Sequence, residues 1–89
     1  MKEVKGIKIT TYETHLGKIP GFMIDIIEQE TEKDTHYYEA WIWHRDFGTK
    51  LLMFGMDSSE VCRGLFFKIV ADNIKAHSCR YLDEVMDED

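Results

Sequence analysis

Hydrophobic and polar residues alternate along most of the first 56 positions, which is the pattern of half-buried β-strands. We expect strands over residues 4–12, 22–29, 35–44 and 50–56. Turn residues separate them, and Gly48 suits the left-handed position of a tight hairpin. Four strands joined by short connections predict an antiparallel meander. The nearly all-apolar strand 50–56 is expected to lie inside the sheet.

The pattern changes to helical spacing after residue 57. Asp57 and Glu60 have the spacing of a capping box, so we expect a helix from Ser58 to about Ala76 or Ser78. The apolar face of this helix is expected to carry Val61, Cys62, Leu65, Phe66, Ile69, Val70, Asn73, Ile74 and His77. The predicted fold class is α+β: a four-stranded antiparallel β-meander followed by one long amphipathic helix packed on one face, a two-layer ββββα domain.

A single helix covers one face of a sheet, so the other face must meet water or a partner. The third strand carries Tyr38, Ala40, Ile42 and His44 on one side, and Tyr37, Glu39, Trp41 and Trp43 on the other. Ala40 and Ile42 make the better seat for a helix. The open face is then expected to carry Lys8 and the aromatic binding candidates Tyr12, Tyr37, Trp41 and Trp43, together with Met23, Asp25 and Ile27 of the second strand. In the reverse arrangement both Trp rings lie in the core.

Acidic residues are concentrated in two blocks. The chain holds 17 acidic and 11 basic side chains, for a net charge of −6. The candidate acidic binding residues are Glu28, Glu30, Glu32, Asp34 and Glu39 in one block, and Asp83, Glu84, Asp87 and Glu88 in the other. Either block suits a basic partner, or else forms a solvated turn and tail. We expect one domain over residues 1–82 and a flexible acidic tail over 83–89.

The sequence offers little chemistry. Residues 44–48 contain the letters of two kinase motifs, but these overlap in one hairpin of an 89-residue chain. His77 and Cys79 form a two-ligand fragment without a partner pair nearby in sequence. Two Cys are too few for a disulfide scaffold, and no apolar run could span a bilayer. We expect a cytoplasmic protein that is not an enzyme, with no catalytic residue, cofactor, metal site or membrane contact.

These features favour a small acidic protein-binding module. Its most specific form is an inhibitor that occupies a basic, nucleic-acid-binding surface of a partner protein. In size, charge and lack of a catalytic motif, the chain is similar in type to anti-CRISPR and other anti-defence proteins of phages and mobile elements. The alternative is a homodimeric structural or regulatory subunit that buries its open aromatic face. Binding of single-stranded nucleic acid to that face is less favoured, because the face carries Lys8 but few other certain cations and acidic groups lie beside it.

Overall fold

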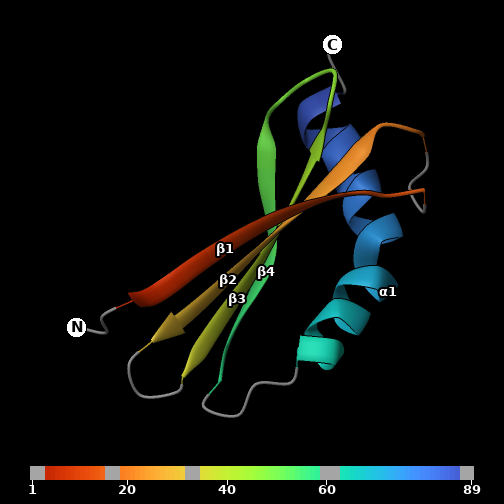
Figure 1. Cartoon of the computed structure of the whole chain (residues 1–89). Coiled ribbons are helices and arrows are strands. Elements are labelled where there is room, and N and C mark those ends of the chain that lie inside the picture. The colour runs from red at the N-terminus through yellow and green to blue at the C-terminus, as the bar shows by residue number, and fades with distance from the viewer. Residues whose placement is uncertain (1–3, 16–18, 32–34, 59–62, 87–89) are drawn as a thin grey trace.

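The computed structural model describes residues 4–15, 19–31, 35–58 and 63–86 of the chain. Four strands precede one helix and one helical turn (Figure 1). The elements are β1 (Val4–Glu13), β2 (Phe22–Thr31), β3 (His36–His44), β4 (Lys50–Ser58), α1 (Arg63–Tyr81) and the π-helical turn η1 (Leu82–Met86). This arrangement confirms the predicted two-layer ββββα fold.

The strands form one sheet in the order β1-β2-β3-β4, with every neighbouring pair antiparallel. The expectation that residues 50–56 lie inside the sheet is wrong, since β4 is an edge strand of the described sheet. The register of β3 and β4 shifts between Ala40 and Trp41, which pair with Phe54 and Leu52. The extra residue, Met53, lets Phe54 and Leu52 face opposite sides of the sheet.

The core lies between α1 and one face of the sheet, and α1 packs mainly on β3 and β4. The expected helix-facing side of β3 is confirmed, because Tyr38, Ala40, Ile42 and His44 are all buried. The buried residues of α1 are Phe66, Val70, Ile74, Ser78 and Tyr81. The buried stripe is therefore rotated from the expected one, and Leu65 is 47% exposed.

The expected start of the helix at Ser58 is wrong. Asp57 and Ser58 belong to β4, where they pair with Tyr37 and His36. The described helix begins at Arg63, and Glu60 lies outside the described residues. Asp and Ser favour helix caps, but here the long β3 strand provides ladder partners for both positions. Tertiary pairing overrides the local capping preference.

The hairpin between β3 and β4 anchors the far end of the helix. Gly48 has a φ of 80°, which confirms its left-handed position. The ring of buried His44 contacts the Pro20 carbonyl oxygen through Nε2 at 2.8 Å and accepts a bond from the Asp46 backbone at Nδ1. The Tyr81 hydroxyl donates to the Thr49 carbonyl oxygen, tying α1 to this hairpin. The described helical structure then continues through η1 to residue 86.

Candidate functional site

The candidate site is the sheet face opposite α1, called the open face below. Strand pairing places one residue from each strand side by side across it, in rows. Its described members are Ile7, Ile9, Thr11 and Glu13 of β1; Met23, Asp25, Ile27 and Gln29 of β2; Tyr37, Glu39, Trp41 and Trp43 of β3; and Lys50, Leu52, Gly55 and Asp57 of β4. The expected open-face position of Tyr37, Trp41 and Trp43 agrees with this pairing.

The edge strands contribute exposed aliphatic side chains to the open face. Ile7 and Ile9 are 60% and 63% exposed, and Leu52 is 43% exposed. The expectation that Lys8 and Tyr12 lie on this face is wrong. Lys8 pairs with Glu28 and Tyr12 with Ile24, and both partners face the helix layer. Alternation shows which β1 residues share a side, but it does not show which side meets the helix.

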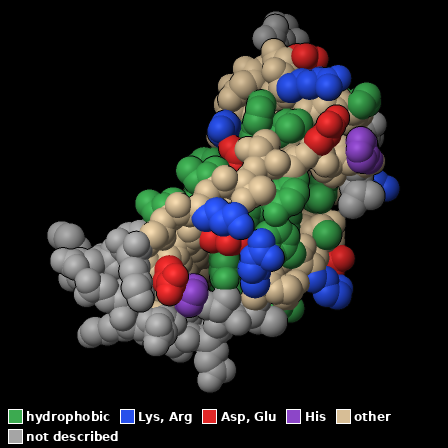
Figure 2. All heavy atoms as spheres, in the orientation of Figure 1, with side chains coloured by type: hydrophobic (Ala, Val, Ile, Leu, Met, Phe, Trp, Pro, Cys, Tyr) green, Lys and Arg blue, Asp and Glu red, His purple; other side chains and the backbone are tan. Residues whose placement is uncertain are grey.

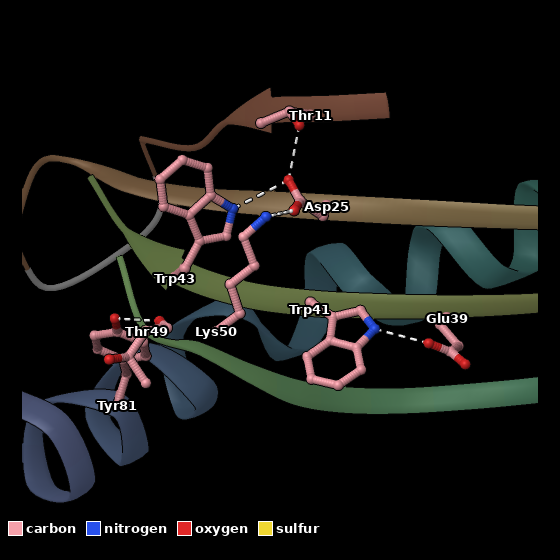
Figure 3. A network of polar contacts seen from close by, with 8 residues as sticks. All are labelled: Thr11, Asp25, Glu39, Trp41, Trp43, Thr49, Lys50 and Tyr81. Carbon is pink, nitrogen blue, oxygen red and sulfur yellow. Dashed lines mark hydrogen bonds and ion pairs between the residues drawn. The ribbon is translucent and has the colours of Figure 1, made fainter. Parts of the chain in front are cut away.

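A buried carboxylate lies in the middle of the open face (Figure 3). Only 7% of the Asp25 side chain is exposed, yet it sits on the side away from α1. Its oxygens accept hydrogen bonds from Thr11 Oγ1 at 2.7 Å, Trp43 Nε1 at 3.0 Å and Lys50 Nζ at 2.7 Å. Burial raises the pKa of Asp25, but these donors outweigh it and hold the pKa below its usual range. The charge is therefore fully compensated within the face.

The aromatic side chains of β3 also satisfy their polar atoms within the open face. Trp41 Nε1 donates to Glu39 Oε2 at 2.7 Å, as Figure 3 shows. The pKa of Tyr37 is raised by burial and by its hydrogen bond to Glu39. The Tyr37 ring lies across Gly55, where any Cβ would collide with it. The polar atoms of these rings are therefore engaged by Glu39 on the same face.

A shallow apolar hollow of about 270 Å³ opens on this face. It is lined by Ile9, Asp25, Ile27, Trp41 and Lys50. The hollow therefore touches all four described strands and lies beside the Asp25 network. Lys50 Nζ also lies 5.0 Å from the centre of the Trp43 ring, a cation–π distance. The hollow can accept an aliphatic side chain but is small for a metabolite.

A second apolar surface lies on the helix side, between β1 and α1. Tyr12 packs edge-to-face on Phe67, with the ring centres 5.8 Å apart. Both line a groove of about 390 Å³, together with residues that include Ile24, Ile26 and Val70. Figure 2 shows this side, where hydrophobic side chains gather between β1 and α1 and charged groups flank them. Tyr12 thus belongs to this groove rather than to the open face.

The structure does not gather the acidic candidates into one patch. Glu28 faces the helix layer and bonds Arg63 Nε at 2.7 Å, while Glu30 is exposed close by. Asp83 and Glu84 lie in η1, at the end of the molecule that holds the β3–β4 hairpin (Figure 1). Glu39 lies on the open face with Trp41. The remaining acidic candidates, Glu32, Asp34, Asp87 and Glu88, lie outside the described residues.

The described residues do not form a metal-binding cluster. Within them, no group of three or more His, Cys, Asp or Glu side chains could hold a metal ion. His77 Nδ1 has no hydrogen-bond partner, and burial followed by the charge of Arg80 lowers the His77 pKa. The kinase-like letters at 44–48 form the hairpin after β3. Among the described helices, none has the length and apolar character needed to cross a membrane.

Sequence reasoning missed the aliphatic part of the open face. Because Lys8 was expected on the open face, alternation put Ile7 and Ile9 on the helix side of β1. No side was predicted for Leu52, which pairs with Trp41 and faces outward. The apolar composition of residues 50–56 was a usable signal, since an edge strand seldom needs apolar residues on both sides. Comparison with protein-family models, curated proteins and solved structures finds no match to this chain.

Proposed function

We propose that this chain is a non-enzymatic protein-association domain of the cytosol, and that its contact surface is the open face. The observation that carries the proposal is the exposure of Ile7, Ile9 and Leu52 on a face whose central polar groups are already paired. Exposed large apolar side chains gathered on one face are characteristic of interaction sites. Trp41 and Trp43 add the residue type most enriched among interface hot spots.

A protein fits this face better than a nucleic acid does. Among the described open-face side chains, Lys50 supplies the positive charge, and it is already paired with Asp25. Glu13, Glu39 and Asp57 add negative charge on the same face. Phosphate groups need clustered Lys and Arg, so stacking of bases on the two Trp rings would lack the usual electrostatic support.

The narrower hypothesis, an inhibitor that resembles anti-CRISPR proteins and occupies a basic surface, relies on the acidic blocks. The described parts of these blocks, represented by Glu30 and Asp83, lie toward opposite ends of a molecule about 47 Å long. A basic partner would therefore meet one block at a time. Glu28 is a poor choice for testing this hypothesis, because its reversal would break the internal Arg63 pair.

The proposed function is tested by the size of the assembly that contains this chain in an extract of its native host. The tagged chain and two variants are separated by size exclusion and detected by the tag. We expect the wild type to elute well above its 10.5 kDa mass. Ile9→Glu combined with Leu52→Glu should return the chain to monomer size.

Leu65→Glu is the matched control, since Leu65 is equally apolar and exposed but lies on α1. It should elute with the wild type. A wild-type chain that elutes as a free monomer in the extract would contradict the proposed function. An assembly that survives both open-face substitutions would show that another surface makes the contact.

A further inference from the structure

The two sides of strand β1 are reversed from what is expected of a sheet whose outer face meets water. Its aliphatic residues Ile7 and Ile9 face outward, while Lys8 and Tyr12 face the helix layer. A one-residue change of register would reverse this, so the observed facing is a specific property of the pairing. Aliphatic side chains exposed to water conflict with the usual burial of apolar residues. This conflict is removed if the open face is one half of a larger core.

We propose that this face packs against the open face of a second copy of the chain, which gives a symmetric dimer with four layers, α-β-β-α. The inference rests on the proposed function and names the partner in it. Sheets packed in this way lie about 10 Å apart, with their strands within about 30° of each other. The exposed aliphatic side chains of both edge strands then become buried between the sheets.

The size of the open face matches what a stable dimer needs. Strands about 4.8 Å apart, each rising about 3.3 Å per residue, give four nine-residue strands a face of roughly 19 by 30 Å. Two such faces cover about 1,100 Å² as flat area, and more once side-chain relief is counted. Specific protein interfaces bury about 1,200–2,000 Å² in total, so the flat area lies close to the lower end of this range and side-chain relief brings it inside.

The open face also offers a second copy a recess and one oppositely charged group. The 270 Å³ hollow beside Ile9 and Trp41 leaves room for an aliphatic side chain of the second copy. If the twofold axis runs across the strands, β4 lies over β4 of the second copy in the opposite direction. Lys50, whose side chain is half exposed, then opposes Asp57 of the second copy near the other end of that strand. Asp25 keeps all three of its donors when the hollow closes.

Sedimentation velocity of the purified chain over a concentration series tests this inference. We expect a species of twice the 10.5 kDa mass to dominate at tens of micromolar and to dissociate on dilution. Ile9→Glu and Leu52→Glu each place a carboxylate in the apolar contact. Each should weaken dimerisation by roughly two orders of magnitude, because an unpaired buried charge is poorly tolerated. Leu65→Glu should dimerise like the wild type.

Each outcome decides the question. A purified wild-type chain that stays monomeric up to about 100 µM overturns the dimer. If it nevertheless joins a larger assembly in host extract, the proposed function stands with a different partner. A dimer that Ile9→Glu disrupts but Leu52→Glu does not would place the contact at the β1 edge, and the face-to-face packing would be wrong. Circular dichroism of each variant shows that its fold is retained.

Discussion

At the scale of single residues, Asp25 is the most informative position. It is a nearly buried carboxylate on a sheet face that α1 does not cover, and it survives there because Thr11, Trp43 and Lys50 all donate to it. Alternation of residues in the sequence could place Asp25 on this face. It could not reveal the network, since the donors come from three other strands and meet only through the register.

We predict that Asp25→Asn lowers the free energy of unfolding by about 1–3 kcal/mol at pH 7, since hydrogen bonds to a charged acceptor are replaced by weaker ones. Urea denaturation measures the change. Asp72→Asn is the control, because Asp72 makes an exposed pair with Lys68 and should cost no more than about 0.5 kcal/mol. Equal losses for the two variants would mean that burial adds nothing to the Asp25 network.

The same residue predicts a pH dependence. The folded state holds the pKa of Asp25 below its usual value near 3.8, so above that value the charged form stabilises the fold. As pH falls toward the lower folded-state pKa, the unfolded chain binds the proton first and the stabilisation is lost. The difference between wild type and Asp25→Asn should therefore be full at pH 6 and should shrink below pH 4. A constant difference down to pH 3 would contradict this assignment.

Tyr81 predicts a second residue-level effect. Its ring is fully buried, and its hydroxyl donates to the backbone oxygen of Thr49. Tyr81→Phe should cost about 1 kcal/mol, since it leaves that carbonyl without its donor. Thr49→Ala keeps the carbonyl and should be nearly neutral. If chemical denaturation gives the two variants the same stability, the bond does not fix α1 to the hairpin.

At the scale of elements, the residue pattern predicted the four strands and their order along the chain well. Strand alternation is a local property, and the turn between β3 and β4 is short enough to be read from Gly48 and its neighbours. What the pattern could not predict was the rotation of each element. The facing of β1 depends on its pairing with β2, and the stripe of α1 depends on which part of the sheet it crosses.

The rotation of α1 can be tested directly. Phe66 is fully buried, and its ring lies within 5.1–5.4 Å of the centres of the Tyr38 and Phe54 rings. Phe66→Ala should therefore cost about 3–5 kcal/mol. Leu65→Ala, one position earlier, should cost less than about 1 kcal/mol, because Leu65 is largely exposed. Similar losses for the two, measured by urea denaturation, would favour the broader apolar stripe expected from the sequence.

The capping signal shows why an element boundary could not be predicted. Asp57 and Glu60 have correct capping-box spacing, but Asp57 is engaged by β3 instead. A sequence motif states what a residue can do in isolation, whereas strand β3 offers Asp57 and Ser58 a ladder of backbone hydrogen bonds. Competing partners of this kind become visible only when the register of distant segments is known.

At the scale of the whole molecule, the acidic charge and the apolar open face favour different partners. The net charge of −6 makes two copies repel each other, whereas it attracts a basic protein. The sign of the salt dependence of association therefore distinguishes a homodimer from a complex with a basic protein. An association driven by the open face should strengthen when salt screens the repulsion, and one driven by the acidic blocks should weaken.

We predict that the dimer dissociation constant falls by several-fold between about 0.1 and 1 M NaCl, the range over which the Debye length shortens from about 10 to about 3 Å. Sedimentation velocity at each salt concentration measures it. Glu30→Lys combined with Asp83→Lys supplies the control, because both residues are exposed and lie off the open face. Because its two copies repel each other less, this variant should dimerise more tightly than the wild type at low salt. Its dissociation constant should also change less as salt is added. A dimer that weakens as salt is added would instead be held by ion pairs, and the apolar contact between the two sheets would not be its main source of affinity.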